Sequence, residues 1–182
     1  QCEELVEKGM IRFIGISNMT IPKLEAVLPF LKILPAVCES EMHPCFQQQE
    51  LFDYLVAHKI FPIGYMPLGS PRRPERDIFE DDVADLERPE IVQIAKAHQC
   101  HPALIALKWA WQRGQIPIPF SVHEKNYFSN LKAMTEDPLT ESEMKILSTL
   151  ECNNRLVKGQ VFLWEGADDW HDLWDEDGTI VQ

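Results

Sequence analysis

The sequence lacks the features that mark membrane, secreted and nucleic-acid-binding proteins. Its 182 residues hold no apolar run near the roughly 20 residues of a membrane span, and no basic segment followed by an apolar one suggests a signal peptide. Lysine and arginine number 17 against 29 acidic residues, a net charge of −12 at pH 7. Because binding to phosphate-rich surfaces needs surplus cations, we expect neither nucleic acid nor membrane as a partner.

Cysteine is present, but not in a pattern typical of cross-links or metal sites. The five cysteines are odd in number, and no two form a C-x-x-C pair. This argues against a disulfide framework and a structural zinc site. We therefore expect reduced thiols, no metal and a cytoplasmic location. The chain begins with Gln1 rather than methionine, which is consistent with missing upstream sequence.

Short β-like runs alternate with stretches of helical periodicity. The expected strands cover residues 11–17, 36–41, 61–66 and 116–121. The expected helices cover residues 21–34, 47–59, 89–99, 102–113 and 140–150. Thr140 and Glu143 have the spacing of a capping box. Strands that alternate with helices predict βαβ units, a parallel sheet and an α/β fold.

Two segments have no clear period. Residues 68–88 contain Gly69, Pro71, Pro74 and many charges, which predicts a long loop of the kind that is usually functional or disordered. The chain after Cys152 interleaves tryptophan with acidic residues. We interpret residues 1–152 as a βα domain and residues 153–182 as a tail. The acidic run 168–177 is expected to be solvated surface.

Four βα units are too few for a closed parallel barrel, which needs about eight strands. A half-barrel would leave sheet edges open to pairing with another chain. Two alternatives follow: an N-terminal half is missing, or two copies of the chain close on each other. We favour the missing half.

Candidate functional residues follow the expected strands, at the face where parallel barrels carry their sites. Each also has an ordinary structural explanation. Ser17-Asn18 is compatible with a plain turn, Glu41 and His43 with a structural hydrogen-bonded pair, and Tyr65 with a core position. The order of the motifs is more specific than any one of them.

In that order, the motifs resemble those of the aldo-keto reductases. They are IGISN, P-A-V-x-x-x-E-x-H-P, GY-x-PLGS and IP-x-S-x(8)-N-L, and the resemblance covers nearly all of residues 3–155. It implies a parallel (β/α)8 TIM barrel, of which this chain supplies roughly the last four βα units and a C-terminal tail. It also implies an oxidoreductase that uses NADP(H) or NAD(H).

The resemblance assigns the nicotinamide end of a cofactor site. Ser17 and Asn18 match the pair that hydrogen-bonds the carboxamide, and Tyr65 matches the aromatic residue on which the nicotinamide ring stacks. At Glu39 the family usually has glutamine. A carboxylate accepts hydrogen bonds but cannot donate them unless protonated, so this contact must change. Trp164 of the tail is a candidate for lining the substrate pocket, with packing on the barrel flank as the alternative.

The resemblance also assigns the phosphate and adenine end. Leu68 and Ser70 match the loop that clasps the pyrophosphate, and Ser121 and Asn130 match positions that hold the 2′-phosphate and the adenine. Two cations of the family are absent, because Phe120 replaces a lysine and Asn126 an arginine. Each lost charge-assisted bond is worth roughly 1.5–3 kcal/mol, so the choice between NADPH and NADH stays open. His123 or Lys125 could compensate.

The implied activity is NAD(P)H-dependent reduction of aldehydes or ketones, with sugars as candidates, in the full-length protein. The family's catalytic Asp, Tyr, Lys and His precede IGISN, so none is in this chain. Tyr54 and Tyr127 lie in helical segments and are not expected to replace the proton donor. We therefore expect no activity from this chain alone. The alternative is a non-catalytic half-barrel module for binding or assembly; another TIM-barrel enzyme is a weaker third hypothesis.

Overall fold

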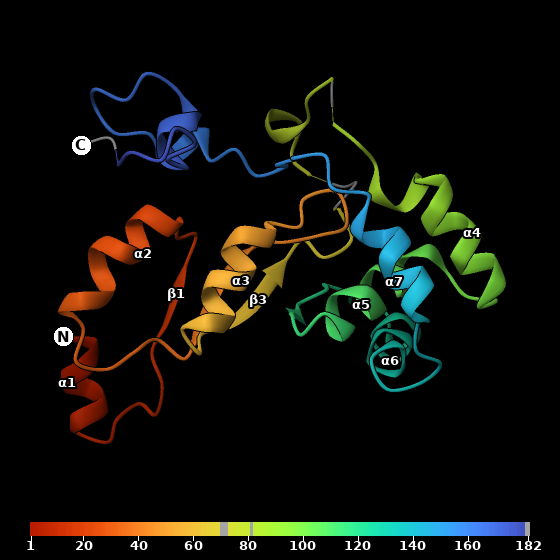
Figure 1. Ribbon diagram of the computed structural model, residues 1–182, viewed down its shortest axis with the longest axis horizontal. Helices are drawn as coiled ribbons and strands as arrows, with labels where there is room; N and C mark the ends of the chain where they lie inside the picture. The colour runs from red at the N-terminus through yellow and green to blue at the C-terminus, as the bar shows by residue number, and fades with distance from the viewer. Residues whose placement is uncertain (70–72, 81, 181–182) are drawn as a thin grey trace. The chain divides into compact units, whose positions relative to one another are not determined.

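Strands and helices alternate along the computed structural model, which describes residues 1–69, 73–80 and 82–180 (Figure 1). Strands β1 (Gly15–Ser17), β2 (Val37–Glu41), β3 (Phe61–Tyr65) and β4 (Ile116–Pro117) form one sheet in that order. The β1–β2 and β3–β4 pairs are parallel. The parallel α/β fold predicted from the periodicity is therefore confirmed.

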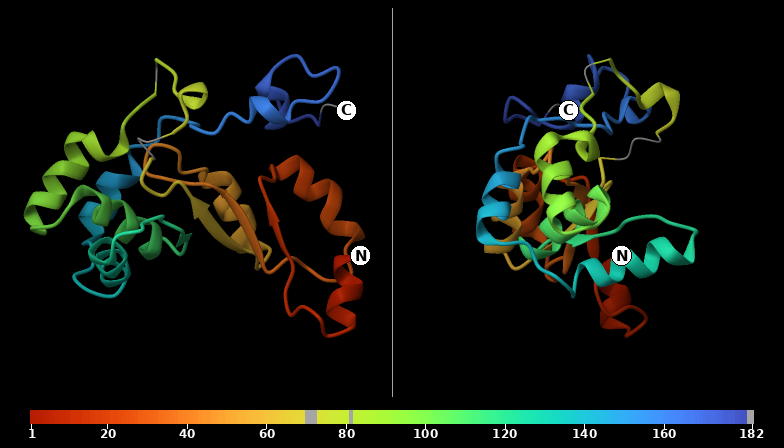
Figure 2. Two further views of the ribbon diagram at one scale, coloured as in Figure 1. Left: turned by 180° about the vertical axis from the view of Figure 1, so that it is seen from behind. Right: turned by 90° about the vertical axis from the view of Figure 1, so that its right-hand side faces the viewer.

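The chain divides into two units. Unit 1 consists of Gln1–Ser40, Gln49–Pro62 and Val157–Gln182, and unit 2 of Glu41–Gln48 and Ile63–Leu156. The chain crosses between them within β2, after Gln48, within β3 and after Leu156. Figure 2 shows the same ribbon from two further sides.

Unit 1 carries helices α1 (Cys2–Glu7), α2 (Ile21–Val27) and α3 (Gln49–Ala57). Thr20 caps α2, and its hydroxyl accepts a hydrogen bond from the backbone N of Lys23. The helix expected over 21–34 ends earlier, at Val27, and a 3-10 turn, η1 (Leu28–Phe30), follows. Pro29 explains the difference, because proline has no N–H to continue the α-helical ladder.

Unit 2 carries helices α4 (Pro89–Ala97), α5 (Pro102–Gln112), α6 (Glu124–Ala133) and α7 (Glu141–Ser148). The predicted capping box of α7 is confirmed, with Thr140 and Glu143 bonding each other's backbone N–H. Helices α4, α5 and α7 and the residues beside α7 supply one hydrophobic core, made of Ile91, Ile94, Ala95, Ile105, Trp109, Ala110, Leu139, Leu147 and Leu150.

A buried glutamine fills the space beside a glycine of β3. The side-chain N of Gln115 donates to the carbonyl oxygen of Met42 at 3.1 Å. A Cβ on Gly64 would lie only 1.8 Å from that nitrogen. The absence of a side chain at Gly64 is therefore what allows Gln115 to reach Met42.

The outer strands are shorter than expected. β1 covers Gly15–Ser17 instead of 11–17, and β4 covers Ile116–Pro117 instead of 116–121. Pro119 explains the end of β4, because it cannot donate to a ladder. Phe120 and Ser121 therefore lie in the connection to α6 rather than on a strand.

The two aperiodic segments contain only short 3-10 turns among the described residues. In the 68–88 loop these are η2 (Glu75–Asp77) and η3 (Asp85–Glu87), and in the tail η4 (Gln160–Phe162) and η5 (Trp170–Leu173). Within the described part of the chain, no helix is long and apolar enough to cross a membrane.

Candidate functional site

The residues singled out by the sequence are distributed over both units, and each unit is described by itself. Unit 1 carries Ser17, Asn18, Glu39 and Trp164. Unit 2 carries Tyr65, Leu68, Phe120, Ser121, Asn126 and Asn130. Ser70 lies outside the described residues.

In unit 1, the end of β1 is hydrogen-bonded to β2 at Glu39. Ser17 pairs in register with Glu39, so their side chains leave the same face of the sheet. The backbone oxygen of Glu39 accepts from the Ser17 hydroxyl at 3.0 Å and from the backbone N of Asn18 at 2.8 Å. Asn18 adopts a left-handed conformation with a φ of 55°. This turn presents exposed Ser17 and Asn18 beside half-buried Glu39.

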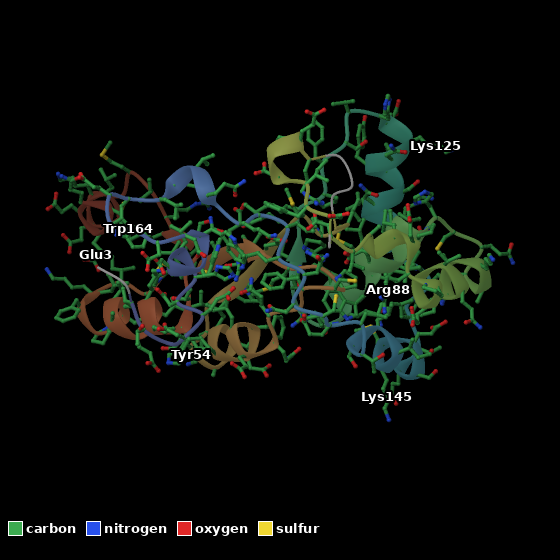
Figure 3. The ribbon with its side chains drawn as sticks, turned by 90° about the horizontal axis from the view of Figure 1, so that it is seen from above. Glu3, Tyr54, Arg88, Lys125, Lys145 and Trp164 are labelled. Carbon is green, nitrogen blue, oxygen red and sulfur yellow. The ribbon has the colours of Figure 1, made fainter. Side chains whose placement is uncertain are left out.

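The tail is attached to the N-terminus of α2, whose N-cap Thr20 lies two residues beyond Asn18. The side chain of Asp175 is fully buried, and Lys23 Nζ lies 2.9 Å from its Oδ2. The Thr20 hydroxyl also bonds that oxygen, and Lys23 Nζ donates to the carbonyl of Leu173 at 2.6 Å. Sequence patterns give no sign of these pairings, because the partners lie about 150 residues apart. Figure 3 labels Trp164, which is half-buried in the tail.

In unit 2, the end of β3 leads into a tight turn. Tyr65 is half-buried, and its carbonyl oxygen accepts from the backbone N of Met42 at 3.3 Å. The turn Met66–Gly69 is closed by a 2.9 Å bond from the N of Gly69 to the O of Met66. Met66 and Gly69 have positive φ values of 49° and 62°. Leu68 is half-buried within this turn.

A buried charge network, Glu41–His43–Asp85, lies beside this turn in unit 2. His43 Nε2 is 3.1 Å from Glu41 Oε1, and His43 Nδ1 is 2.9 Å from Asp85 Oδ2. All three side chains have no exposed surface. With a carboxylate at each ring nitrogen, both nitrogens act as donors and the imidazole is protonated.

The pKa of His43 reflects this arrangement. Burial alone would lower it, but the hydrogen bonds to Asp85 and Glu41 outweigh burial and raise the pKa to about 9. The expected pairing of Glu41 with His43 is confirmed. Asp85 was not expected, because it follows His43 by 42 residues within a segment that has no period.

The residues expected at the phosphate and adenine end lie around α6. The Ser121 hydroxyl accepts from the backbone N of His123 at 3.2 Å. Asn126 and Asn130 are one helical turn apart and share a face of α6. Phe120 is 88% exposed, so the position where the family has a lysine carries an uncharged side chain in solvent. Lys125 is exposed on the same helix (Figure 3).

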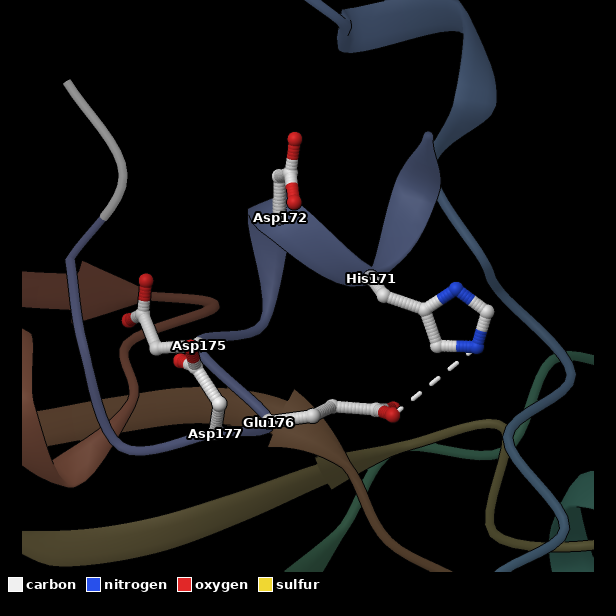
Figure 4. A pocket seen from close by; sticks show the side chains of 5 residues that line it. All are labelled: His171, Asp172, Asp175, Glu176 and Asp177. Atoms are coloured by element: carbon white, nitrogen blue, oxygen red, sulfur yellow. Dashed lines mark ion pairs between the residues drawn. The ribbon is translucent and has the colours of Figure 1, made fainter. Parts of the chain in front are cut away.

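An acidic hollow of about 210 Å³ lies in the tail (Figure 4). It is lined by His171, Asp172, Asp175, Glu176 and Asp177. Among the described residues, no group of histidine, cysteine and acidic side chains has the geometry to hold a metal ion.

Known proteins match this chain over most of its length. The model of the Aldo/keto reductase family matches residues 1–151. The aldo/keto reductase slr0942 of Synechocystis is 37% identical over 175 residues, which cover 96% of this chain and 53% of that protein. Aldo-keto reductase family 1 member A1 of Xenopus tropicalis is 35% identical over 155 residues, or 85% of this chain and 46% of that protein.

A solved structure agrees. The crystal structure of apo Gox0644 matches with a TM-score of 0.73 and 29% identity, covering 84% of this chain and 52% of that one. The chain thus spans about half the length of the proteins that it matches.

Proposed function

The chain belongs to the aldo/keto reductase family, and we propose that it forms the cofactor-binding half of an NAD(P)H-dependent enzyme. The full-length protein would reduce aldehydes or ketones, with sugars as candidates, in the cytoplasm, where free cysteines such as these stay reduced. The bound nicotinamide would supply a hydride. What this chain contributes is binding and orientation.

The observation that carries the proposal is the turn at the end of β1. The Ser17 hydroxyl donates its hydrogen to the Glu39 carbonyl, so its oxygen can still accept a hydrogen bond from an amide N–H. The left-handed conformation of Asn18 redirects the chain directly after the strand. A hydroxyl acceptor next to a side-chain amide suits a carboxamide, which has one donor group and one acceptor. Tyr65 at the end of β3 would offer a flat ring for stacking.

The turn after β3 fits a pyrophosphate. Met66 and Gly69 both have left-handed conformations, and tight turns of this kind can direct backbone N–H groups at an anion. Leu68 would contact the pyrophosphate with its backbone N–H, and Ser70 with its hydroxyl. At the adenine end, Ser121 and Asn130 remain proposed ligands. Phe120 and Asn126 supply no charge for the 2′-phosphate, so we propose that the protein discriminates only weakly between NADPH and NADH.

This chain would not transfer the proton. Tyr54 lies on α3, stacked on His58 with ring centroids 4.1 Å apart. Burial and nearby Glu25 raise its pKa, which makes it a poorer acid. Tyr127 is 50% exposed on α6. Neither is placed like a catalytic acid at a strand end, so activity would require the catalytic Asp, Tyr, Lys and His from further polypeptide.

Apolar side chains near β4 support the need for that polypeptide. β4 is an outer strand of the described sheet. Ile116, Ile118, Phe120 and Val122 alternate along it and the residues after it, and all are exposed. An outer strand with such side chains favours pairing with another segment. We propose the N-terminal half-barrel as that segment. A discrete dimer of the purified chain in analytical ultracentrifugation would instead favour self-association and a non-catalytic module.

Titration with NADPH and with NADH, followed by nicotinamide and tryptophan fluorescence, tests the proposal. We expect saturable binding of at least one cofactor and no turnover of carbonyl substrates. Tyr65→Ala should weaken binding about tenfold through loss of ring stacking, whereas the same change at exposed Tyr127 should not. A folded sample that binds neither cofactor would refute the cofactor site.

A further inference from the structure

One carboxylate joins both ends of the loop between β3 and α4. The loop begins in the turn Met66–Gly69, and Asp85 lies near its other end, in η3. The Asp85 Oδ2 accepts hydrogen bonds from His43 Nδ1 at 2.9 Å and from the backbone N of Cys45 at 3.0 Å. These bonds hold Asp85 on the segment that follows β2.

The same carboxylate packs against the turn. A Cβ built on Gly69 would lie 2.3 Å from Asp85 Oδ1 and 2.5 Å from its Cγ. The backbone of Gly69 therefore rests directly on the Asp85 carboxyl group, and the space is too small for any side chain. No residue in the described ranges donates a hydrogen bond to Oδ1. Its role at this position is to fill the space under the turn.

We propose that Asp85 is a positioning residue for the dinucleotide. Held by His43 and Cys45, it fixes the turn Met66–Gly69 in the conformation that presents Leu68 to the pyrophosphate. The inference deepens the proposed function and rests on it. Preorganisation of this kind acts through affinity, because a turn that is already ordered loses less freedom when a ligand binds.

A purely structural role would have different consequences. If Asp85 only stabilised unit 2, its removal would lower the folded fraction and weaken every ligand by the same factor. If it positions the turn, the loss should fall on ligands that carry a pyrophosphate. Reduced nicotinamide riboside lacks both phosphates and the adenosine, but keeps the nicotinamide and its ribose. Comparing it with NADPH therefore separates the two roles.

The experiment titrates both ligands into the folded chain and into Asp85→Asn, which keeps the shape of the side chain. We expect the Kd for NADPH to rise about tenfold, with the Kd for the riboside unchanged. Ile105→Val is the matched control, because it removes one buried methyl group from the core of unit 2 and leaves Asp85 in place. It should leave both Kd values unchanged.

Gly69→Ala tests the contact between Gly69 and Asp85 by changing the other partner. It also replaces Asp85→Asn as the test variant if that variant does not fold. Its Cβ would push the carboxylate away, so it should show the same selective loss for NADPH. If a folded variant bound NADPH with the wild-type Kd, or bound both ligands more weakly by the same factor, the inference would be overturned. The proposed function would not be affected. A wild-type chain that binds neither ligand would overturn the proposed function and this inference with it.

Discussion

Lys23 Nζ lies 2.9 Å from the buried Oδ2 of Asp175 and thereby binds the tail to the helix that follows Asn18. The same ammonium group donates to the carbonyl oxygen of Leu173. One side chain thus makes two contacts with the tail. The helix that begins three residues after Asn18 is therefore also the attachment point of the segment that carries Trp164.

Replacing Lys23 should release the tail. Lys23→Met keeps the length of the side chain but leaves Asp175 buried without its cation. Hydrogen bonds to charged groups contribute about 1.5–3 kcal/mol, and Lys23 is 28% exposed, so we expect a loss near the lower end of that range. Limited proteolysis should cut the tail faster. Lys8→Met, at an exposed lysine, is the control, and equal cleavage rates in both variants would contradict the prediction.

The stability of the chain should fall as the pH rises from neutral to alkaline. The pKa of His43 is raised from its ordinary value of 6.5 to about 9 by Asp85 and Glu41, against the opposing effect of burial. The protonated ring therefore stabilises the folded state fully below pH 6.5, and this contribution disappears as the pH passes through about 9. It amounts to roughly 3 kcal/mol by linkage.

Urea unfolding between pH 6 and 9.5 measures this effect. His98 also has a raised pKa, chiefly because of its hydrogen bond to Asp137, so the series belongs in a His98→Asn background. Asp85→Asn should move the loss to lower pH, because it removes one of the two carboxylates that hold the proton. A flat profile between pH 6.5 and 9 would show that His43 is neutral in the folded chain.

Restoring charge near α6 should create a preference for NADPH. Phe120→Lys and Asn126→Arg reinstate the cations that the family carries, and Phe120 is already exposed to solvent. Each new charge-assisted bond to a 2′-phosphate is worth roughly 1.5–3 kcal/mol, so the double variant should favour NADPH over NADH by about 10²–10⁴. Competitive titration gives the ratio. Ile146→Lys on α7 controls for the change in net charge. A comparable change in the NADPH/NADH ratio in that variant would argue against local recognition of the 2′-phosphate.

The capping box of α7 should make a measurable contribution to stability. Thr140→Ala removes the side chain that accepts from the backbone N of Glu143, and loss of such a cap costs about 0.5–2 kcal/mol. Thermal unfolding would show a lower Tm. Thr135→Ala removes a hydroxyl that, within the described ranges, bonds only the carbonyl of Lys132, so its Tm should stay closer to that of the wild type.

The sequence was sufficient for features that depend on neighbours along the chain. The capping box of Thr140 and Glu143 and the parallel α/β fold could be predicted, because periodicity and cap spacing are local signals. The helix from Ile21 was predicted too long because the apolar period continues beyond Pro29, which breaks the ladder. The extent of β4 was missed for a similar reason at Pro119.

The site was predictable in part. Ser17 and Glu39 are paired across β1 and β2 as consecutive parallel strands allow, but their ligand roles remain predictions. Asp85 and Asp175 were not predictable as partners of His43 and Lys23. Each lies in an aperiodic, acid-rich segment where many carboxylates look alike, and only tertiary packing decides which one is buried.

The packing of Gln115 against Gly64 restricts the order in which these two positions can evolve. Any larger residue at 64 collides with the amide while the glutamine is present. A smaller residue at 115 avoids this collision if it comes first, but that intermediate leaves the Met42 carbonyl without its donor. Homologous sequences that carry a side chain at 64 should thus also have lost the glutamine at 115. A homologue with a side chain at 64 and glutamine at 115 would show that the two can be accommodated together.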